Sequence, residues 1–406
     1  MDAPLLLKAF ELTDILWRLP IYPKLFFVWN PKTLQFQTHP RHLHYITYCL
    51  FFLCPQLLLL VMVLVQLLVI LPNSHFGTTI NWIIGVGMLQ CCIFTLSMNT
   101  LLFVRRVETI GFINSLISHN YFKGQEDVEY LDDSSPGLIS CFKCLFKELV
   151  KFLRQENCDT IGILLNICAL ELVCICPLMA VCGVFLSVYK EVDLDFTFYI
   201  WMYYFEKNPG ILVHIYRVIL AYQHVSEIFW TASYILIIAV GLGNCILSSL
   251  QRIRKESKEN FPRAMKNYKK FVVLQQQGRS IVSTLVFLLM GTGYAIIVVA
   301  LSITVACFNI LPIYVYWVAP VGSGIALLAL VTILPYATSC YTGSLSILNE
   351  WSCRIMSKGR RKELKAMRPI CFMFGSLKPL NNESKTEYLT SIFDRTMDLI
   401  MFLDIK

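Results

Sequence analysis

Six long apolar runs constrain the fold of this chain more than any other feature of its sequence. They cover roughly residues 45–71, 78–104, 160–188, 226–250, 281–308 and 311–337. A helix needs about 20 apolar residues to cross a hydrocarbon core of about 30 Å, and each run is long enough. Because a backbone in lipid must satisfy its own hydrogen bonds, the runs predict helices and an all-α membrane protein.

The composition agrees with this prediction. The 406 residues are 56% hydrophobic and only 15% charged, whereas a typical soluble domain is about 45–50% apolar and about 25% charged. The chain therefore has too little polar surface to cover a soluble globule of its size. This argues against a soluble enzyme, a disulfide-rich secreted domain and a disordered chain.

Two of the predicted helices are expected to be longer than the membrane is thick. Asn208-Pro209-Gly210 breaks the chain, and a helical pattern begins at Ile211, well before the fourth apolar run. The sixth helix is expected to continue past Pro335 toward Trp351.

The last 20 residues, 387–406, are just long enough to form a seventh span. They carry Asp394, Arg395, Asp398 and Asp404, which are costly against lipid but tolerated where a helix faces water or protein. The sequence therefore predicts seven transmembrane helices if the tail spans, and six spans with a cytosolic tail helix if it does not.

The lysine and arginine residues are distributed very unevenly. Thirty of the 35 lie in residues 1–44, 105–159, 251–280 and 351–386, while the alternate segments at 72–77, 189–210 and 309–310 hold only Lys190 and Lys207. Since basic residues near membrane spans stay in the cytosol, the N-terminus is predicted to be cytosolic and the C-terminus extracellular.

These observations predict the organisation of the whole chain. It comprises a cytosolic N-terminal segment at 1–44, a six-helix transmembrane bundle at 45–350 with a long cytosolic loop at 105–159, a basic cytosolic linker at 351–386 and a C-terminal helix at 387–406.

The sequence offers little for catalysis or metal binding. Cys141-x-x-Cys144 lies in the predicted loop, but a zinc site needs four ligands and no histidine follows at finger spacing. The sequence has no hydrolase elbow, phosphate loop or metalloprotease motif. We therefore expect no enzymatic activity, no catalytic residue, no metal, no cofactor and no nucleic-acid partner.

The most specific motifs lie near the C-terminus. A basic stretch at 358–364 is followed by Arg368-Pro369-Ile370, then by Phe372 and Gly375, and then by the tail helix. Together with the chain length, the predicted spans and the cytosolic N-terminus, this order resembles the insect-type (arthropod) odorant and gustatory chemoreceptor superfamily. The gustatory signature of the last span (Thr-Tyr, five apolar residues, Gln-Phe) is absent, so the resemblance implies a divergent member.

The resemblance carries expectations about function. Members of this superfamily are ligand-gated, non-selective cation channels of the cell membrane that small odorant or tastant molecules open. They form homo- or hetero-tetramers of related subunits, their last helices line a central pore, and the cytosolic ends of the fourth to seventh helices anchor the subunits together. Each subunit has its own ligand pocket in the outer half of the bilayer.

The tail helix can be compared with such a pore. Asp394 and Asp398 are four residues apart and share one helix face, and four copies would form carboxylate rings that favour cations. Leu399 and Phe402 lie toward the outer end and are expected to form an apolar constriction. The alternative is that Asp394 and Arg395 pair with residues on the cytosolic side and only anchor the helix.

A ligand pocket is expected to be apolar and aromatic, with a few polar groups. The candidate ligand-binding residues are Trp82, Glu171, Phe185, Tyr189, Tyr314 and Trp317. For the aromatic residues the alternative is an interfacial belt. For Glu171, the one carboxylate in the middle of the third run, the alternatives are that it is protonated or that it hydrogen-bonds to a neighbouring helix.

Two other functional classes remain open. One is a seven-helix receptor of the G-protein-coupled type, which the predicted cytosolic N-terminus disfavours. The other is a secondary transporter, in which Gly291-Thr292-Gly293 and Gly322-Ser323-Gly324 would unwind two helices.

Overall fold

The structure is a computed structural model of the chain. It describes residues 27–30, 33, 35–38, 45–46, 48–73, 79–121, 211–306, 308, 316, 318–354, 357–375 and 378–403. The predicted third span at 160–188 and the predicted loop beyond residue 121 lie outside the described residues.

Five helices among the described residues are long and apolar enough to cross a membrane. They are α3 with its continuation through η2 and α4 (Cys54–Asn73), α5 (Thr79–Val104), α11 (Ile211–Glu259), α12 (Phe261–Ala306) and α14 (Val318–Ser352). This supports the predicted class, an all-α membrane protein. The total of seven spans and the orientation of the termini stay predictions.

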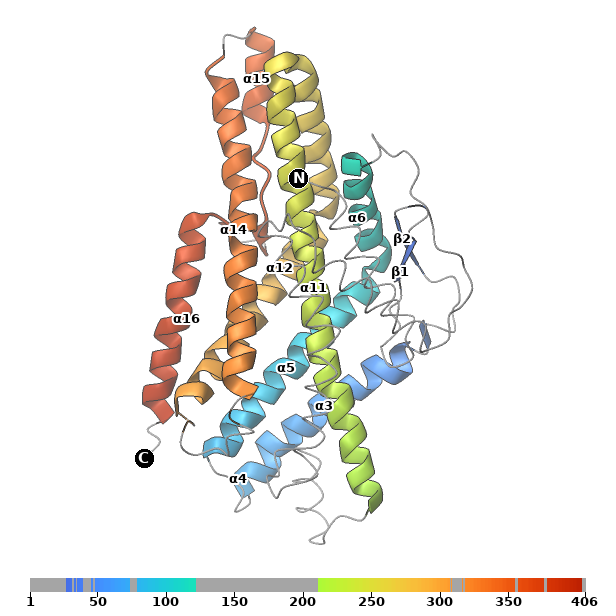
Figure 1. Cartoon of the computed structure of the whole chain (residues 1–406), viewed down its shortest axis with the longest axis vertical. Helices are drawn as coiled ribbons and strands as arrows, with labels where there is room; N and C mark the ends of the chain where they lie inside the picture. The colour runs from blue at the N-terminus through green and yellow to red at the C-terminus, as the bar shows by residue number, and fades with distance from the viewer. Residues whose placement is uncertain are drawn as a thin grey trace, which may run out of the picture.

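Three of these helices form a long central bundle. α11, α12 and α14 pack on one another and run along the long axis of the molecule, with α3 and α5 beside their lower half (Figure 1). Their 49, 46 and 35 residues correspond to about 74, 69 and 52 Å at about 1.5 Å per residue. All three exceed a hydrocarbon core of about 30 Å. The predicted overlength of the fourth and sixth helices is thus confirmed.

The fifth predicted helix is also much longer than expected. The apolar run begins at residue 281, but α12 begins at Phe261, because its first twenty residues pack as an amphipathic helix against α11 and α14. Asn260 ends α11 and caps α12, since its side-chain oxygen accepts a hydrogen bond from the Arg263 N–H at 3.1 Å.

An aromatic cluster holds the upper ends of the three long helices together. Trp351 of α14 is fully buried and packs edge-on against Phe261 and Tyr268 of α12, at ring distances of 5.4 and 5.6 Å. The Arg354 guanidinium lies 5.3 Å from the Phe261 ring. We call this end of the molecule, where α11 turns into α12 and where α15 (Lys358–Ala366) lies, the basic end (Figure 1).

The glycine runs do not interrupt the long helices. α12 continues through Gly291-Thr292-Gly293, and α14 continues through Gly322-Ser323-Gly324 and past Pro335 to Ser352. The unwound helices expected of a transporter are therefore not seen at either run.

The structure adds strands that the sequence analysis does not predict. β1 (Phe27–Asn30) pairs with β2 (Gln35–Thr38), and β3 (Met373–Phe374) pairs with β4 (Lys378–Pro379), both antiparallel. Asn114 of α6 (Arg106–Tyr121) holds β2: its side-chain amide both donates to and accepts from the Phe36 backbone, each at 2.8 Å. A side-chain amide thus takes the place of a neighbouring strand.

Gly278 allows α6 and α12 to approach closely. A Cβ atom at this position would lie 2.3 Å from the ring of Phe112, which is buried. We expect Gly278→Ala to lower the free energy of unfolding by about 1–3 kcal/mol, the usual cost of overpacking. Thermal unfolding of the detergent-solubilised protein measures this. Gly291→Ala on the same helix is the control, because a Cβ atom there would meet no neighbouring residue within 4 Å; equal stability of the two variants would contradict the prediction.

Candidate functional site

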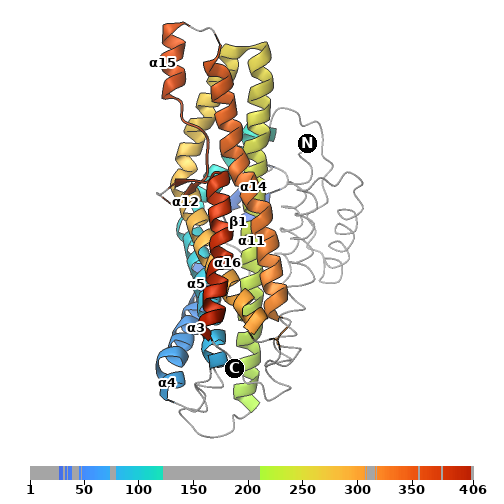
Figure 2. The same ribbon diagram turned by 90° about the vertical axis from the view of Figure 1, so that its left-hand side faces the viewer.

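The C-terminal helix α16 (Asn382–Leu403) lies at the edge of the bundle. It packs on α12 and α14 and stands in front of them in Figure 2, with its outer side turned away from the described helices. The Asn381 side chain caps its N-terminus by accepting a hydrogen bond from the Ser384 N–H at 2.7 Å. α16 is not among the five helices apolar enough to span by composition alone.

One face of α16 is buried. Ser384, Ile392 and Thr396 are buried at intervals of four or eight residues, which is the spacing of a single helix face. Ile392 is completely buried and packs with Ile297 and Val298 of α12. This apolar contact fixes which side of the helix faces the bundle.

Two tyrosines reinforce this contact with hydrogen bonds. The Tyr388 hydroxyl donates to the Met290 carbonyl of α12 at 2.6 Å, and the Tyr294 hydroxyl donates to the Ser391 carbonyl of α16 at 3.1 Å. The two rings are edge-on, with centroids 5.7 Å apart. We call Tyr294 and Tyr388 the tyrosine clamp, since each ring spans the α12–α16 interface.

The opposite face of α16 is acidic and exposed. Glu387, Asp394 and Asp398 are spaced by seven and four residues, which places them roughly opposite Ile392 at about 100° per residue. Glu387 forms an ion pair with Lys378. No side chain in the described part of the chain pairs with Asp394.

Arg395 forms an ion pair with one member of the predicted carboxylate row, Asp398. Its guanidinium lies 2.9 Å from the Asp398 carboxylate, so it pairs along the helix and not with a residue of another element. Both side chains are more than half exposed, and an exposed pair of this kind contributes little to stability. The Asp398 carboxylate is therefore only partly neutralised.

The apolar residues expected at the outer end of the helix differ in environment. Leu399 is half-buried against the α12 cluster around Ile297, whereas Phe402 is 84% exposed. Phe393, Met397 and Met401 are exposed as well. The outer side of α16 thus combines carboxylates with large apolar side chains, none of which packs on the described bundle.

The linker before α16 is tied to the long helices at several points. The Ile370 N–H donates to the Ser344 hydroxyl of α14 at 2.7 Å, and the Gln275 amide of α12 donates to the Cys371 carbonyl at 2.5 Å. Gly375 adopts a positive φ of 57° against the Phe287 ring, a conformation that favours glycine. Burial raises the pKa of the Cys371 thiol. The Arg-Pro-Ile element and the glycine noted in the sequence are therefore the points at which the linker docks.

Five of the six predicted ligand residues lie outside the part of the chain that the structure describes. They are Glu171, Phe185, Tyr189, Tyr314 and Trp317. Trp82 is described, and it packs against the apolar contact between α3 and α5, near Leu67 and Met88.

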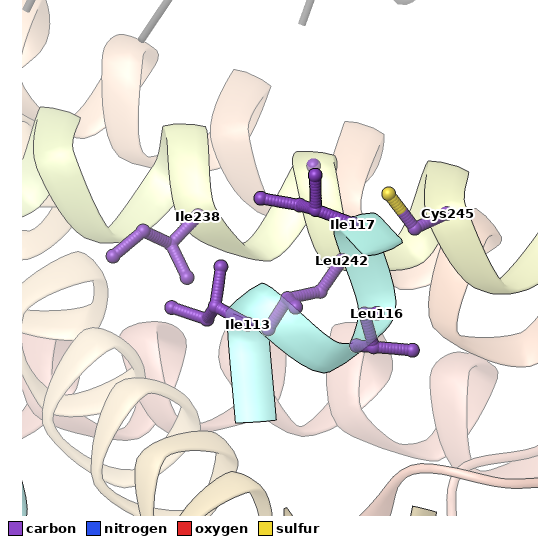
Figure 3. A pocket seen from close by; sticks show the side chains of 7 residues that line it. Ile113, Leu116, Ile117, Ile238, Leu242 and Cys245 are labelled. Atoms are coloured by element: carbon purple, nitrogen blue, oxygen red, sulfur yellow. The ribbon is translucent and has the colours of Figure 1, made fainter. Parts of the chain in front are cut away.

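Two apolar cavities are found among the described helices. The first, shown in Figure 3, lies between α6 and α11 and is lined by Ile113, Leu116, Ile117, Ile238, Leu242 and Cys245. Its volume of about 10 Å³ holds about one water molecule at most. The second, an open groove of about 490 Å³ between α3 and α5, has the volume of a ligand site, but it includes none of the six predicted ligand residues.

The sequence analysis missed a buried polar cluster between α3, α5 and α11. The Gln56 amide donates to the Glu227 carboxylate at 2.8 Å, and the Thr95 hydroxyl donates to the Gln56 oxygen at 3.2 Å. Cys92, Thr95 and Asn99 of α5, like His224, Glu227 and Thr231 of α11, follow a three-then-four spacing. This shared spacing in two apolar segments was the signal that could have revealed the cluster.

The comparisons with known proteins add no assignment. The chain matches no protein-family model, and no curated protein is similar to it in sequence.

The tyrosine clamp predicts how firmly α16 is held. Tyr388→Phe removes one hydroxyl and its hydrogen bond, which we expect to cost about 0.5–1.5 kcal/mol and to speed amide hydrogen exchange in the first turns of α16. Tyr341→Phe on α14 is the matched control, because none of the described hydrogen bonds involves its hydroxyl. Unchanged exchange in Tyr388→Phe would show that the clamp does not hold the helix.

Proposed function

We propose that the chain is a chemosensory receptor of the insect type, a ligand-gated non-selective cation channel in the cell membrane, in which α16 lines the pore. The observation that carries this proposal is the amphipathic placement of α16: its apolar face packs on the bundle and its acidic face is exposed. The proposal includes seven spans, a cytosolic N-terminus, an extracellular C-terminus and a small odorant or tastant ligand.

The charges on the outer face argue for a water-filled neighbour. Asp394 and Asp398 lie in the C-terminal half of α16, which runs alongside α12 and α14 in Figure 2. If α16 crosses the bilayer with these helices, its carboxylates cannot face lipid without a large cost. A central aqueous pore shared by several copies removes this cost, and rings of carboxylates favour cations.

The exposed apolar residues argue for contacts between copies. Phe393, Met397 and Met401 of α16 are more than half exposed and lie along one side of the acidic row at about 100° per residue. In a tetramer, as in the superfamily that the chain resembles, these side chains would pack against the neighbouring subunit while the carboxylates face the axis. The acidic face of the helix would then meet water, and the apolar side next to it would meet protein.

The basic end supports the predicted anchor. α11, α12 and α14 extend about 20–40 Å beyond a hydrocarbon core of about 30 Å, and the main hydrophobic core continues into this end, where it includes Trp351. Lys269 pairs with Glu363 of α15 at 3.1 Å. In the proposed topology this end lies in the cytosol, where the subunits would be held together.

Accessibility of tags at both ends tests the topology. We expect an N-terminal tag to be hidden in intact cells and a C-terminal tag to be exposed. Two hidden tags would place α16 in the cytosol and remove the pore assignment, and an exposed N-terminal tag would overturn the orientation. Current recording with a ligand panel then tests the channel, since a carrier's turnover gives far smaller currents.

Removal of the acidic row should weaken cation selection. We expect Asp398→Asn, and Asp394→Asn more strongly because Asp394 has no ion pair in the described structure, to reduce the cation-to-anion permeability ratio several-fold. Reversal potentials in asymmetric salt measure this ratio. Glu363→Gln is the control, because this carboxylate pairs with Lys269 at the basic end; an equal effect in all three variants would contradict a pore role for α16.

A further inference from the structure

The buried polar cluster between α3, α5 and α11 carries an inference of its own. The helices α5 and α11 make their side-chain contacts with a constant offset in sequence: Cys92 with His224, and Asn99 with Thr231, are each 132 residues apart. Thr95 and Glu227 have the same offset. The two helices therefore run parallel with three successive polar layers between them.

Glu227 occupies the middle layer. It is 4% exposed, and Gln56 and Thr95 beside it are fully buried. One carboxylate oxygen, Oε2, accepts the Gln56 amide at 2.8 Å, whereas Oε1 is buried without a hydrogen-bond partner in the described structure. A buried carboxylate oxygen without a donor or a positive charge is unfavourable.

His224, one turn away on the same helix, also has a buried polar atom without a hydrogen-bond partner in the described structure. It is 2% exposed. Its Nε2 lies 3.9 Å from the Cys92 sulfur, and its Nδ1 is buried with no partner among the described side chains. Two titratable groups thus lie three residues apart on one helix, each with one unsatisfied buried atom.

We propose that this cluster is a proton-binding site, in which Glu227 takes up one proton from solvent and His224 assists. An O–H bond forms at Oε1, and the carboxylate charge is removed without breaking any other bond. The protonated oxygen becomes a donor, while Oε2 keeps the Gln56 hydrogen bond. We choose a proton as the ligand because hydrogen bonds already join these side chains directly, from Thr95 to Gln56 and from Gln56 to Glu227.

The surrounding groups leave few other ways to neutralise Glu227. The nearest titratable side chains in the described structure are Tyr48, which precedes η1 (Cys49–Leu53) and interacts electrostatically with Glu227, and the Cys92–His224 pair one layer away. Gln223 also hydrogen-bonds the carboxyl group, but Oε1 stays without a partner among the described residues. No lysine or arginine among the described side chains pairs with Glu227. The predicted third span at 160–188, which lies outside the described residues, contains no lysine or arginine either.

Proton uptake would change the contact between α5 and α11. The protonated carboxyl offers a donor toward the neighbouring layers, whereas the carboxylate accepts only. If the proposed channel function holds, this gives the protein a second chemical input, so that ligand-evoked current depends on pH through Glu227. Proton binding itself does not rest on that function.

Infrared difference spectroscopy of the full-length protein in lipid vesicles tests proton binding without any current. Lowering the pH from about 9 to about 5 spans the range in which buried carboxyls commonly titrate. We expect the C=O band of a protonated, water-shielded carboxyl to appear, to be lost in Glu227→Gln and to persist at a shifted frequency in Glu227→Asp. Glu387→Gln is the matched control, since this carboxyl is exposed and paired with Lys378.

Two further measurements keep the test decisive. If Glu227→Gln fails to fold, Gln56→Leu replaces it: loss of the donor to the carboxylate should move the appearance of the band to higher pH. Identical spectra in wild type, Glu227→Gln and Glu227→Asp would overturn the proposal, as would a band that does not change over the whole pH range. A Glu227-dependent band without ligand-evoked current would support the proton site and count against the channel.

Discussion

The need of a backbone in lipid to satisfy its own hydrogen bonds is the constraint on which the rest of this structure depends. It makes every spanning segment a helix. In α11, α12 and α14 the helices continue far beyond the apolar runs and must bury their amphipathic ends on one another. Trp351, Phe261 and Tyr268 pack together at that end of the hydrophobic core. The linker before α16 packs against α14 and α12 through hydrogen bonds to Ser344 and from Gln275. These contacts fix the position at which α16 begins.

The same constraint makes polar groups in the membrane-spanning part informative. On α16, which the proposed function takes to cross the bilayer, the carboxylates turn outward, away from the apolar contact at Ile392, so their solvation would come from water or another subunit. Between α3, α5 and α11 the polar groups turn inward and hydrogen-bond across helices, as Gln56 of α3 and Glu227 of α11 do. The first arrangement supports the proposed pore, and the second supports the proposed proton site. Both follow from the high cost of an unsatisfied charge in a low dielectric.

Much of the fold could be predicted because hydropathy is a local property. The helices α3, α5, α11, α12 and α14 coincide with predicted spans, and the extension of α14 to Ser352 was expected. The strands β1 and β2 could not be predicted, since they depend on the Asn114 side chain of a distant helix. The start of α12 was placed twenty residues too late, because Tyr268 and Phe271 are buried by partners and not by lipid. At the candidate site, the acidic face of α16 was readable from spacing, but its ion pair with Arg395 was not.

The sequence by itself determined that the chain is a helical membrane protein, that two helices are longer than the bilayer is thick and that the tail helix has an acidic face. Each of these depends on the residues of a single segment, because the helix period places residues three or four positions apart on the same face. Only the tertiary structure decided which face of α16 is buried, where the linker docks and that Glu227 meets Gln56 and Thr95. Those contacts join residues up to 171 positions apart, and their energy comes from the packing of whole helices, which no single segment encodes.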